Sequence, residues 1–401
     1  MEQKNSFIRD HLSDEYYFSS LCESYGISRQ SGYRLVRRYE AEGEDAFMDK
    51  SKRPLSSPGE TSPEIVARIK YWRGFMKRCK FGAKKIHLRL TLEFDVERLP
   101  SLTTIHNILV REGLVVPRKK KRKVVAQHPR FDPTTSNEIW SIDHKGKFRL
   151  GNGRYCSPLT VCDSFSRFLF AAKGQYSENW RDTKQVLRSL FQQWGQPQHL
   201  HSDNGSAFAS IQSPRGFGAL SYWLLDHGIL PVFSDPGSPG QNGRHERMHK
   251  DLKKECCNPP SINLRVQNRS MNRFKSVYNE IRGHESLDMR FPCDVHSRSA
   301  TEYVDKVIDP VYGSELQTRK VCLNGAVRWK SHEWVTVCRA LSGKYVGVLP
   351  LGNRVYEIYY RQECLGYFQQ GEDIIKGHYY RLKSDRDLPH RYRDRGNRKR
   401  K

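Results

Sequence analysis

Long apolar runs and paired cysteine motifs are both missing from this sequence. No apolar stretch approaches the roughly 20 residues that a membrane-spanning helix requires, and the start, MEQKNSFIRD, lacks the apolar core of a signal peptide. None of the ten cysteines belongs to a CxxC pair, which argues against a zinc knuckle or a disulfide framework. We therefore expect a cytoplasmic protein with reduced thiols and no membrane partner.

Acidic residues are scarce relative to basic ones. The chain has 44 Asp and Glu against 69 Lys and Arg, a net charge of +25. Such an excess indicates a polyanionic partner, and nucleic acid is the commonest one. Hydrophobic residues at 37% and aromatic residues at 11% exclude a disordered chain, and the length of 401 residues predicts two to four folded domains.

Residues 14–43 have the pattern of two short helices around a glycine. Apolar side chains recur at helical spacing before Gly26, which is a helix stop, and Ser28 can cap the next helix. The basic residues expected on the outer face of that second helix are Arg29, Arg34, Arg37 and Arg38. This pattern predicts a helix-turn-helix whose second helix enters the major groove of DNA. The alternative is a plain helical hairpin with a solvated basic face.

A second helical unit follows the Pro/Ser-rich linker SKRPLSSPGETSP. Apolar residues at helical spacing mark one helix around Ile65 and Ile69, and another that stops at Gly113. This unit is a second candidate for a helix-turn-helix. The basic run PRKKKRK at 117–123 then predicts a flexible strap that contacts phosphates without reading sequence.

From residue 137 the pattern changes to short strands alternating with helices. In NEIWSIDHKGKF, Trp140 and Ile142 alternate with Ser141 and Asp143, as in a half-buried strand. Two more strands, a helix, and then two further strands each followed by a helix predict a mixed five-stranded sheet flanked by helices. Residues 320–370 return to short strands with Gly- and Asn-rich turns, which predicts a small all-β barrel.

The predicted fold class is therefore multidomain, with all-α helix-turn-helix modules, an α/β core and a small C-terminal all-β barrel. The expected boundaries are 1–55 for the first helical domain, 60–117 for the second, 118–136 for a basic linker, 137–300 for the α/β core, 315–372 for the barrel and 373–401 for a basic tail.

Three carboxylates can meet at one edge of the predicted sheet. Asp143 and Asp203 each end a strand, which is where sites form in open sheets flanked by helices. Glu246, on the helix after the last strand, can supply the third, with Lys250 and Lys253 on the same helix face beside the DNA backbone. Carboxylate oxygens hold hard cations such as Mg²⁺, and two such ions can clamp the attacking and leaving oxygens of a phosphodiester.

Each acid also has a plain structural interpretation. The sequence DNG after the fourth strand is a strong turn signal. Asp143 could end its strand in a turn, and Glu246 could pair with Lys250. Asp163 also falls at a strand end near the site, and the histidines that flank the three acids are interpreted as packing or surface residues. Only the combination of the three acids favours the catalytic hypothesis.

Taken together, WSIDHKGKF, DSFSRFL, HSDNGSAF and PGSPGQNGRHERMHKDLKKE resemble the catalytic core of the DDE transposases and retroviral integrases, and bacterial insertion-sequence transposases in particular. LCESYGISRQSGYRLVRRYEAEG resembles their N-terminal helix-turn-helix, and YNEIRGHESLDMRFPCDV the segment after their last catalytic helix. The resemblance covers nearly the whole chain. It departs in a longer interval between Asp203 and Glu246, assigned to the loop SIQSPRGFG, and in Gly283, where a proline is usual.

The resemblance implies an RNase H-like core and assigns Asp143, Asp203 and Glu246 as catalytic, metal-binding residues that hold Mg²⁺ or Mn²⁺, two ions per active site. It implies a bacterial DNA transposase, associated with the nucleoid when bound to DNA. Water would cut the transposon end, and the resulting 3′-OH would attack target DNA without a covalent protein intermediate. The implied partners are double-stranded transposon-end and target DNA and at least one further copy of the chain, with no small-molecule cofactor.

Other functions compete with this one. A DNA-binding regulator derived from an inactive transposase would be favoured by loss of an acid, and all three acids are present. A retroviral-type integrase would normally open with a His/Cys zinc module, whose spacing is not found in the first 60 residues. A simple ribonuclease would not need two helical DNA-reading modules. A tyrosine recombinase would need an Arg/His/Tyr pattern that the sequence does not match.

Overall fold

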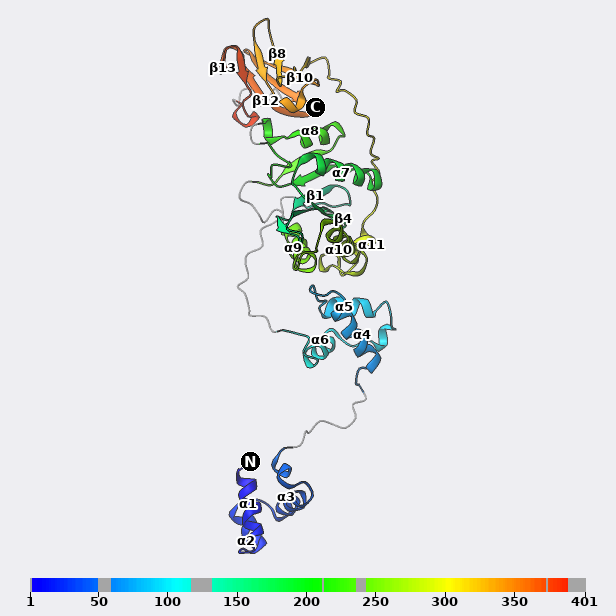
Figure 1. Ribbon diagram of the computed structural model, residues 1–401, viewed down its shortest axis with the longest axis vertical. Coiled ribbons are helices and arrows are strands. Elements are labelled where there is room, and N and C mark those ends of the chain that lie inside the picture. The colour runs from blue at the N-terminus through cyan, green and yellow to red at the C-terminus, as the bar shows by residue number, and fades with distance from the viewer. Residues whose placement is uncertain are drawn as a thin grey trace. The chain divides into compact units, whose positions relative to one another are not determined.

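The computed structural model describes residues 2–49, 59–116, 132–210, 213–235, 243–372 and 374–388. The predicted basic strap PRKKKRK and the last part of the predicted basic tail lie outside the described residues. The chain divides into two compact units, Met1–Thr61 and Ser62–Lys401 (Figure 1). Within the described ranges, no helix is both long and apolar enough to cross a membrane.

The first unit is a bundle of three helices. They are α1 (Glu2–Leu12), α2 (Phe18–Ser24) and α3 (Arg29–Glu42). As predicted, Gly26 lies between α2 and α3 with a φ of +64°, and the Ser28 hydroxyl accepts the N–H of Ser31 at 3.2 Å. Gly32 allows α3 to approach α2 closely, because a Cβ at Gly32 would lie 2.7 Å from the Sγ of Cys22. The helix-turn-helix prediction is confirmed, and α1 is an additional helix.

The second unit begins with three further helices. They are α4 (Pro63–Gly74), α5 (Ala83–Leu90) and α6 (Leu102–Arg111). The hydroxyls of Ser62 and Ser101 cap α4 and α6 by accepting backbone N–H groups of their first turns. The sequence indicated α4 and α6 but not α5. Ile69, Ile86 and Ile105, one from each helix, are fully buried. Their core is shared with two later helices of the same unit, α9 (Gly243–Leu252) and α10 (Leu264–Ser276).

One carboxylate ties this helical module to the rest of the second unit. Glu255 accepts the backbone N–H groups of Lys77, Arg78 and Cys79 at 3.0, 2.9 and 2.8 Å. Because three donors converge on one carboxylate, the loop between α4 and α5 is held in a defined position against the segment that carries Glu255. The helical module therefore packs as part of the second unit rather than as a separate body.

The described residues of the second unit contain a six-stranded central sheet. Its strands are β1 (Ile139–His144), β2 (Phe148–Arg149), β3 (Tyr155–Asp163), β4 (Leu169–Gln175), β5 (His199–Ser202) and β6 (Leu230–Phe233). Five of them follow the order β2-β3-β1-β5-β6, and β4 pairs with β3 along the edge opposite to β1. Strand β1 is antiparallel to β3 and parallel to β5, and β5 is parallel to β6. The mixed five-stranded sheet is confirmed, with the two-residue β2 added at one side.

Helices cover both faces of the sheet. They are α7 (Trp180–Trp194), α8 (Ala219–Asp226), α9 (Gly243–Leu252), α10 (Leu264–Ser276) and α11 (Pro292–Val295), with π-helical turns at Lys253–Cys257 and Val277–Ile281. Trp140 and Ile142 pack with α7 and α8, whereas Leu169 and Ala172 pack with α9 and α10 (Figure 1). Because strand side chains alternate between faces, Asp143 faces the side of the sheet that α9 covers.

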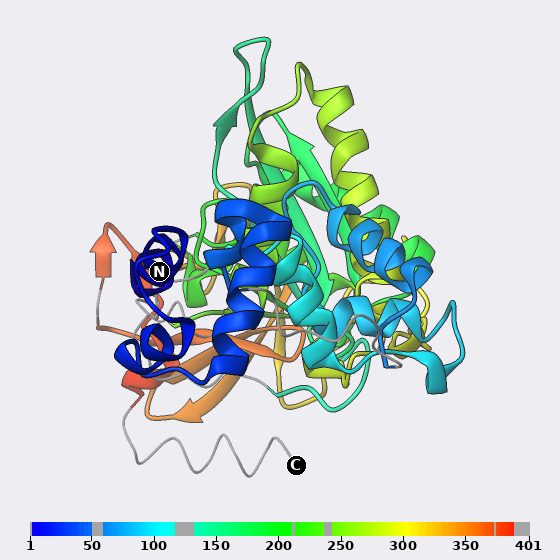
Figure 2. The ribbon, with the colours of Figure 1, turned by 90° about the horizontal axis from the view of Figure 1, so that it is seen from below.

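A hairpin extends the sheet beside α10. The turn between β2 and β3 contains the predicted Gly-Asn-Gly sequence, and Gly153 has a φ of +79°. The N–H groups of Gly151 and Asn152 bond to the carbonyls of Ser261 and Ile262, just before α10 (Figure 2). These two bonds anchor the turn to the segment that leads into α10.

The C-terminal part of the second unit is all-β. Its strands are β7 (Gln317–Lys320), β8 (Ala326–Arg328), β9 (Trp334–Thr336), β10 (Tyr345–Gly352), β11 (Val355–Tyr360), β12 (Glu363–Gln369), β13 (Ile374–Lys376) and β14 (Tyr379–Arg381). Among the described residues they form two four-stranded sheets, which the bridges Val321–Val327 and Tyr367–Lys383 join. The sequence placed the end of the barrel at residue 372, whereas β13 and β14 continue it.

The all-β part is packed against the core through α8. Asp226, at the end of α8 and only 4% exposed, is paired with Lys344 and Arg361 and accepts the hydroxyl of Tyr360. The loop SIQSPRGFG supplies a second contact, because Arg215 pairs with Glu363 at 3.1 Å. The interval that lengthens the spacing between Asp203 and Glu246 thus includes residues that hold the β domain.

Gly283 stands where a proline is usual in the family that the sequence resembles, and a larger residue does not fit at this position. A Cβ at Gly283 would lie 2.5 Å from the carbonyl oxygen of Met289 and 2.3 Å from the side chain of Leu88 on α5. Such distances are shorter than real Cβ contacts, so any side chain at this position would displace the 283–289 loop or α5. The close packing of α5 on this loop explains the glycine.

Candidate active site

Asp143 lies near the end of β1 in a mostly buried position. Its side chain is 16% exposed, and Asp143 is paired with Thr160 of β3 in the antiparallel ladder. The alternation predicted from sequence is confirmed here, since Trp140 and Ile142 are fully buried on the opposite face. The sheet therefore directs Asp143 away from the apolar core and toward α9.

Asp203 follows the last residue of β5, the strand parallel to β1. It is exposed, and its Oδ1 accepts the N–H of Gly205 at 3.0 Å. Asn204 reaches the carbonyl of Ser234 after β6 at 2.9 Å, which braces the turn. The turn interpretation of DNG is confirmed, because the Asp203–Gly205 bond closes a turn directly after β5. Asp203 stands at the carboxyl end of that strand, and its role as a metal ligand stays a prediction.

Glu246 is exposed in the first turn of α9. His245, the residue before it, and His249, three residues after it, face inward, since they are 1% and 3% exposed. Helix α9 is preceded by residues 236–242, which lie outside the described ranges. Glu246 thus stands at the end of α9 that follows β6, on the helix that covers the Asp143 face of the sheet.

The electrostatic environment of Asp143 includes the other two acids. The pKa of Asp143 is raised to about 7, first by burial and then by the carboxylates of Asp203 and, to a smaller extent, Glu246, while Lys145 opposes them. A carboxyl group that is held among like charges favours a divalent cation that would neutralise them. The three oxygen-donor side chains therefore fit Mg²⁺ or Mn²⁺ in chemistry. In the described residues, however, no group of three or more His, Cys, Asp or Glu side chains is placed to hold a metal ion.

The basic residues predicted to bind DNA are mostly exposed. Arg29, Arg34 and Arg37 are exposed on α3, whereas Arg38 is partly buried and bonds to Glu42 and to the carbonyl of Met48. Lys250 and Lys253 are exposed on the same segment as Glu246, where Lys253 is the first residue of the π-helical turn. Arg38 thus braces the end of α3, and the other residues are available to a partner.

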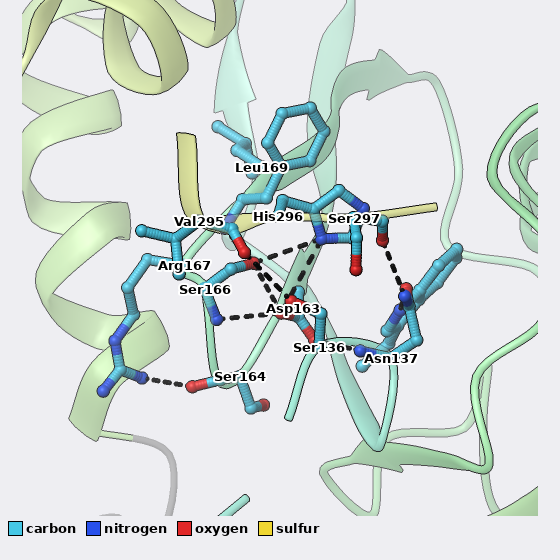
Figure 3. Close-up of polar contacts among 12 residues, drawn as sticks. Ser136, Asn137, Asp163, Ser164, Ser166, Arg167, Leu169, Val295, His296 and Ser297 are labelled. Atoms are coloured by element: carbon cyan, nitrogen blue, oxygen red, sulfur yellow. Dashed lines mark hydrogen bonds and ion pairs between the residues drawn. The ribbon is translucent and has the colours of Figure 1, made fainter. Parts of the chain in front are cut away.

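Asp163, the competing carboxylate, is fully buried in a network of its own (Figure 3). It accepts the backbone N–H of Asn137 at 3.1 Å and both the N–H and the hydroxyl of Ser166. His296, in the segment after α11, lies 3.9 Å from it, and the Asn137 side chain donates to the carbonyl of Ser297. Asp163 therefore joins the start of β1, the β3–β4 turn and the segment after α11.

Sequence reasoning missed a set of polar residues between Asp143 and α9. The Thr160 hydroxyl contacts the Nε2 atoms of His245 and His249, both at 2.6 Å. His249 also places its Nδ1 3.5 Å from Oδ2 of Asp143. A threonine between Leu159 and Val161 in a buried strand, and two histidines four residues apart in a polar helix, are the signals that could have indicated this cluster.

Three sequence-family models match the chain. Two describe an integrase core domain and match residues 133–239 and 227–292, and one describes a homeodomain-like domain and matches residues 31–109. The integrase matches contain Asp143, Asp203 and Glu246, and the homeodomain-like match begins within α3.

Among curated proteins, the chain is 27% identical over 239 residues to the insertion element IS476 uncharacterized 39.2 kDa protein of Xanthomonas euvesicatoria, covering 57% of this chain. It is 31% identical over 115 residues to the Pro-Pol polyprotein of Simian foamy virus type 1, covering 28% of this chain. The chain spans 64% of the length of the first relative and 9% of the second.

Solved structures of integrases are also similar in part. The HTLV-2 integrase catalytic core domain in complex with magnesium has 17% identity and a TM-score of 0.31, covering 41% of this chain and 100% of that one. The simian T-cell lymphotropic virus intasome in complex with PP2A regulatory subunit B56 gamma has 16% identity and a TM-score of 0.34, covering 69% of this chain and 93% of that one.

Proposed function

We propose that this chain is an insertion-sequence transposase of the DDE, retroviral integrase-like superfamily. In this proposal it binds insertion-sequence ends and catalyses metal-dependent cleavage and strand transfer of DNA. Its partners are double-stranded end DNA and target DNA. Because two ends must be held together during strand transfer, the active form contains at least two copies of the chain.

The proposed reaction exchanges phosphodiester bonds in two steps. A water oxygen attacks a phosphorus at the insertion-sequence end, the bond to the 3′ oxygen breaks, and a 3′-OH is released. That 3′-OH then attacks a target phosphorus in line, and the 3′ oxygen of the target leaves. When bound, divalent cations supply Lewis-acid activation of the attacking and leaving oxygens.

The chain's own residues hold and orient the reacting groups. Asp143 from β1, Asp203 from β5 and Glu246 from α9 are the proposed ligands of the cations. Lys250 and Lys253 hold the DNA backbone next to them. No side chain forms a covalent bond to DNA in this scheme, so no serine or tyrosine nucleophile is required.

The observation that carries the proposal is the position of Asp143, a mostly buried acid whose pKa two further acids raise. Asp143 lies on β1, and Asp203 comes directly after β5, the parallel neighbour of β1. The charges of Asp203 and Glu246 both raise the pKa of Asp143. Such an arrangement supports a site in which a cation compensates the three acids.

A strand-transfer assay tests this proposal directly. The purified full chain is mixed with a duplex that carries the inverted repeat flanking its gene and with plasmid target DNA. We expect joined products with Mg²⁺ or Mn²⁺ and none when EDTA removes the cation. Binding of the duplex without any cleavage or joining, with either cation, would instead favour a DNA-binding regulator derived from an inactive transposase.

The exposed arginines of α3 are proposed to bind the insertion-sequence ends. Replacing Arg34 and Arg37 together with alanine is expected to weaken end binding by roughly tenfold or more and to lower the dependence of log affinity on log salt by about two, one for each phosphate contact. Footprinting and salt titration measure both effects.

A matched control removes the same charge from another helix of the first unit. The double variant Lys4→Ala and Arg9→Ala takes two cations from α1 and should leave the footprint unchanged. An unchanged footprint for the Arg34 and Arg37 variant would contradict the assignment of α3 as the DNA-reading helix.

A further inference from the structure

Three polar side chains are buried at the junction of β3 and α9. Thr160 is fully buried, and His245 and His249 are 1% and 3% exposed. Both imidazole Nε2 atoms lie 2.6 Å from the Thr160 hydroxyl oxygen, and that hydroxyl also lies 3.1 Å from the carbonyl oxygen of Asp143. One hydroxyl group thus connects the strand that carries Asp143 with the helix that carries Glu246.

The hydrogen-bonding capacity of these groups is matched. A hydroxyl has one hydrogen and two lone pairs, so all three contacts are satisfied when Thr160 donates to the Asp143 carbonyl and each imidazole donates from Nε2.

The cluster lies directly beside the proposed catalytic residues. Thr160 is the ladder partner of Asp143, and the two histidines stand one residue before and three residues after Glu246 on α9. Glu246 is exposed while both histidines face the sheet. A rotation of α9 about its axis would break one of the two 2.6 Å contacts and would move Glu246 relative to Asp143.

Burial alone does not require polar groups at this junction. Met248 and Leu252, also on α9, are 3% and 0% exposed and already supply apolar packing against the rest of the unit. Apolar packing is non-directional, whereas hydrogen bonds are directional and costly to leave unmade. The polar cluster therefore fixes the rotation of α9 about its axis, whereas the apolar contacts only hold the helix against the rest of the unit.

We propose that Thr160, His245 and His249 are positioning residues that set the separation of Asp143 and Glu246, and so the affinity of the acid site for a divalent cation. This inference rests on the proposed function, in which the three acids hold the cation. Residues that orient metal ligands affect metal affinity about 10- to 100-fold in other metal sites.

Thr160→Val tests the proposal, because valine keeps the shape of threonine and removes the hydroxyl. Mn²⁺ binding to the full chain is measured by the electron paramagnetic resonance signal of the free ion, without DNA or turnover. We expect the affinity for Mn²⁺ to fall by about 10-fold or more, and Thr160→Ser, which keeps the hydroxyl, to restore it.

Thr183→Val is the matched control for lost stability. Thr183 is also a fully buried threonine whose hydroxyl bonds at 2.9 Å, but its partner is the carbonyl of Asn179 at the start of α7. It should lower the thermal unfolding midpoint to a similar extent and leave Mn²⁺ affinity unchanged. If Thr160→Val does not fold, His249→Leu provides the test, since it keeps the bond between Thr160 and His245 and should weaken Mn²⁺ binding in the same way.

The outcomes separate this inference from the proposed function. Wild-type Mn²⁺ affinity in a folded Thr160→Val or His249→Leu protein overturns the positioning role. An equal loss of affinity in Thr183→Val also overturns it, because the effect would then come from general destabilisation. If the Mn²⁺ affinity of the wild-type chain is unchanged by Asp203→Asn, the acid site itself is refuted, and the positioning role falls with it.

Discussion

Asp203→Asn is expected to abolish strand transfer with Mg²⁺ while binding of end DNA stays nearly unchanged. Asparagine keeps the shape of the side chain and can still accept the N–H of Gly205, the bond that closes the turn. It removes the negative charge that a cation ligand needs. The loss of a catalytic carboxylate corresponds to a rate reduction of roughly 1000-fold or more, since several kcal/mol of charge stabilisation disappear.

The measurement compares joined products and gel-shift affinity for the same protein preparation. Asp235→Asn is the matched control, because Asp235 is another exposed aspartate, located just after β6. The control should retain strand transfer. Activity that survives in Asp203→Asn, with end binding intact, would refute the assignment of this acid.

Asp163→Ala is expected to damage the fold rather than the reaction. The fully buried carboxylate accepts two backbone N–H groups and one hydroxyl, and alanine would leave those donors without an acceptor. Breaking such a buried network costs about 3–5 kcal/mol. For a unit of this size, the thermal unfolding midpoint should fall by about 10 °C.

Ser166→Ala is the control for this second prediction. It removes one of the donors to Asp163 and leaves the backbone N–H groups of Asn137 and Ser166 bonded, so a much smaller decrease in the midpoint is expected. Thermal unfolding followed by circular dichroism measures both variants. An Asp163→Ala protein with wild-type thermal stability and no strand transfer would mean that Asp163 acts in the reaction.

The sequence predicted those structural features that depend on a single residue or on the periodicity of a short segment. Gly26 and Ser28 marked the boundary between α2 and α3 because a positive φ and a helix cap depend on single residues. The face of Asp143 followed from alternation along β1, which is a property of any strand. The order of strands and helices in the core followed from the change of period along the chain.

What the sequence did not predict depends on contacts between distant segments. Thr160 and His249 are 89 residues apart, and each has an ordinary interpretation by itself. Helix α5 has only eight residues and is stabilised by burial of Ile86 and Leu90 against other helices, so its own pattern is weak. The role of Gly283 depends on Leu88, which is located on that unpredicted helix.

The network around Asp163 has a consequence for the order in which this protein can fold during synthesis. Asn137, just before β1, bonds to Ser297, and Ser136 bonds to Val295, across 160 and 159 residues of chain. A ribosome must therefore translate the whole core before its first strand acquires these partners. Because contacts at such separation form late, a nascent chain can fold its N-terminal helices, the proposed DNA-binding part, before the proposed catalytic acids are held in place.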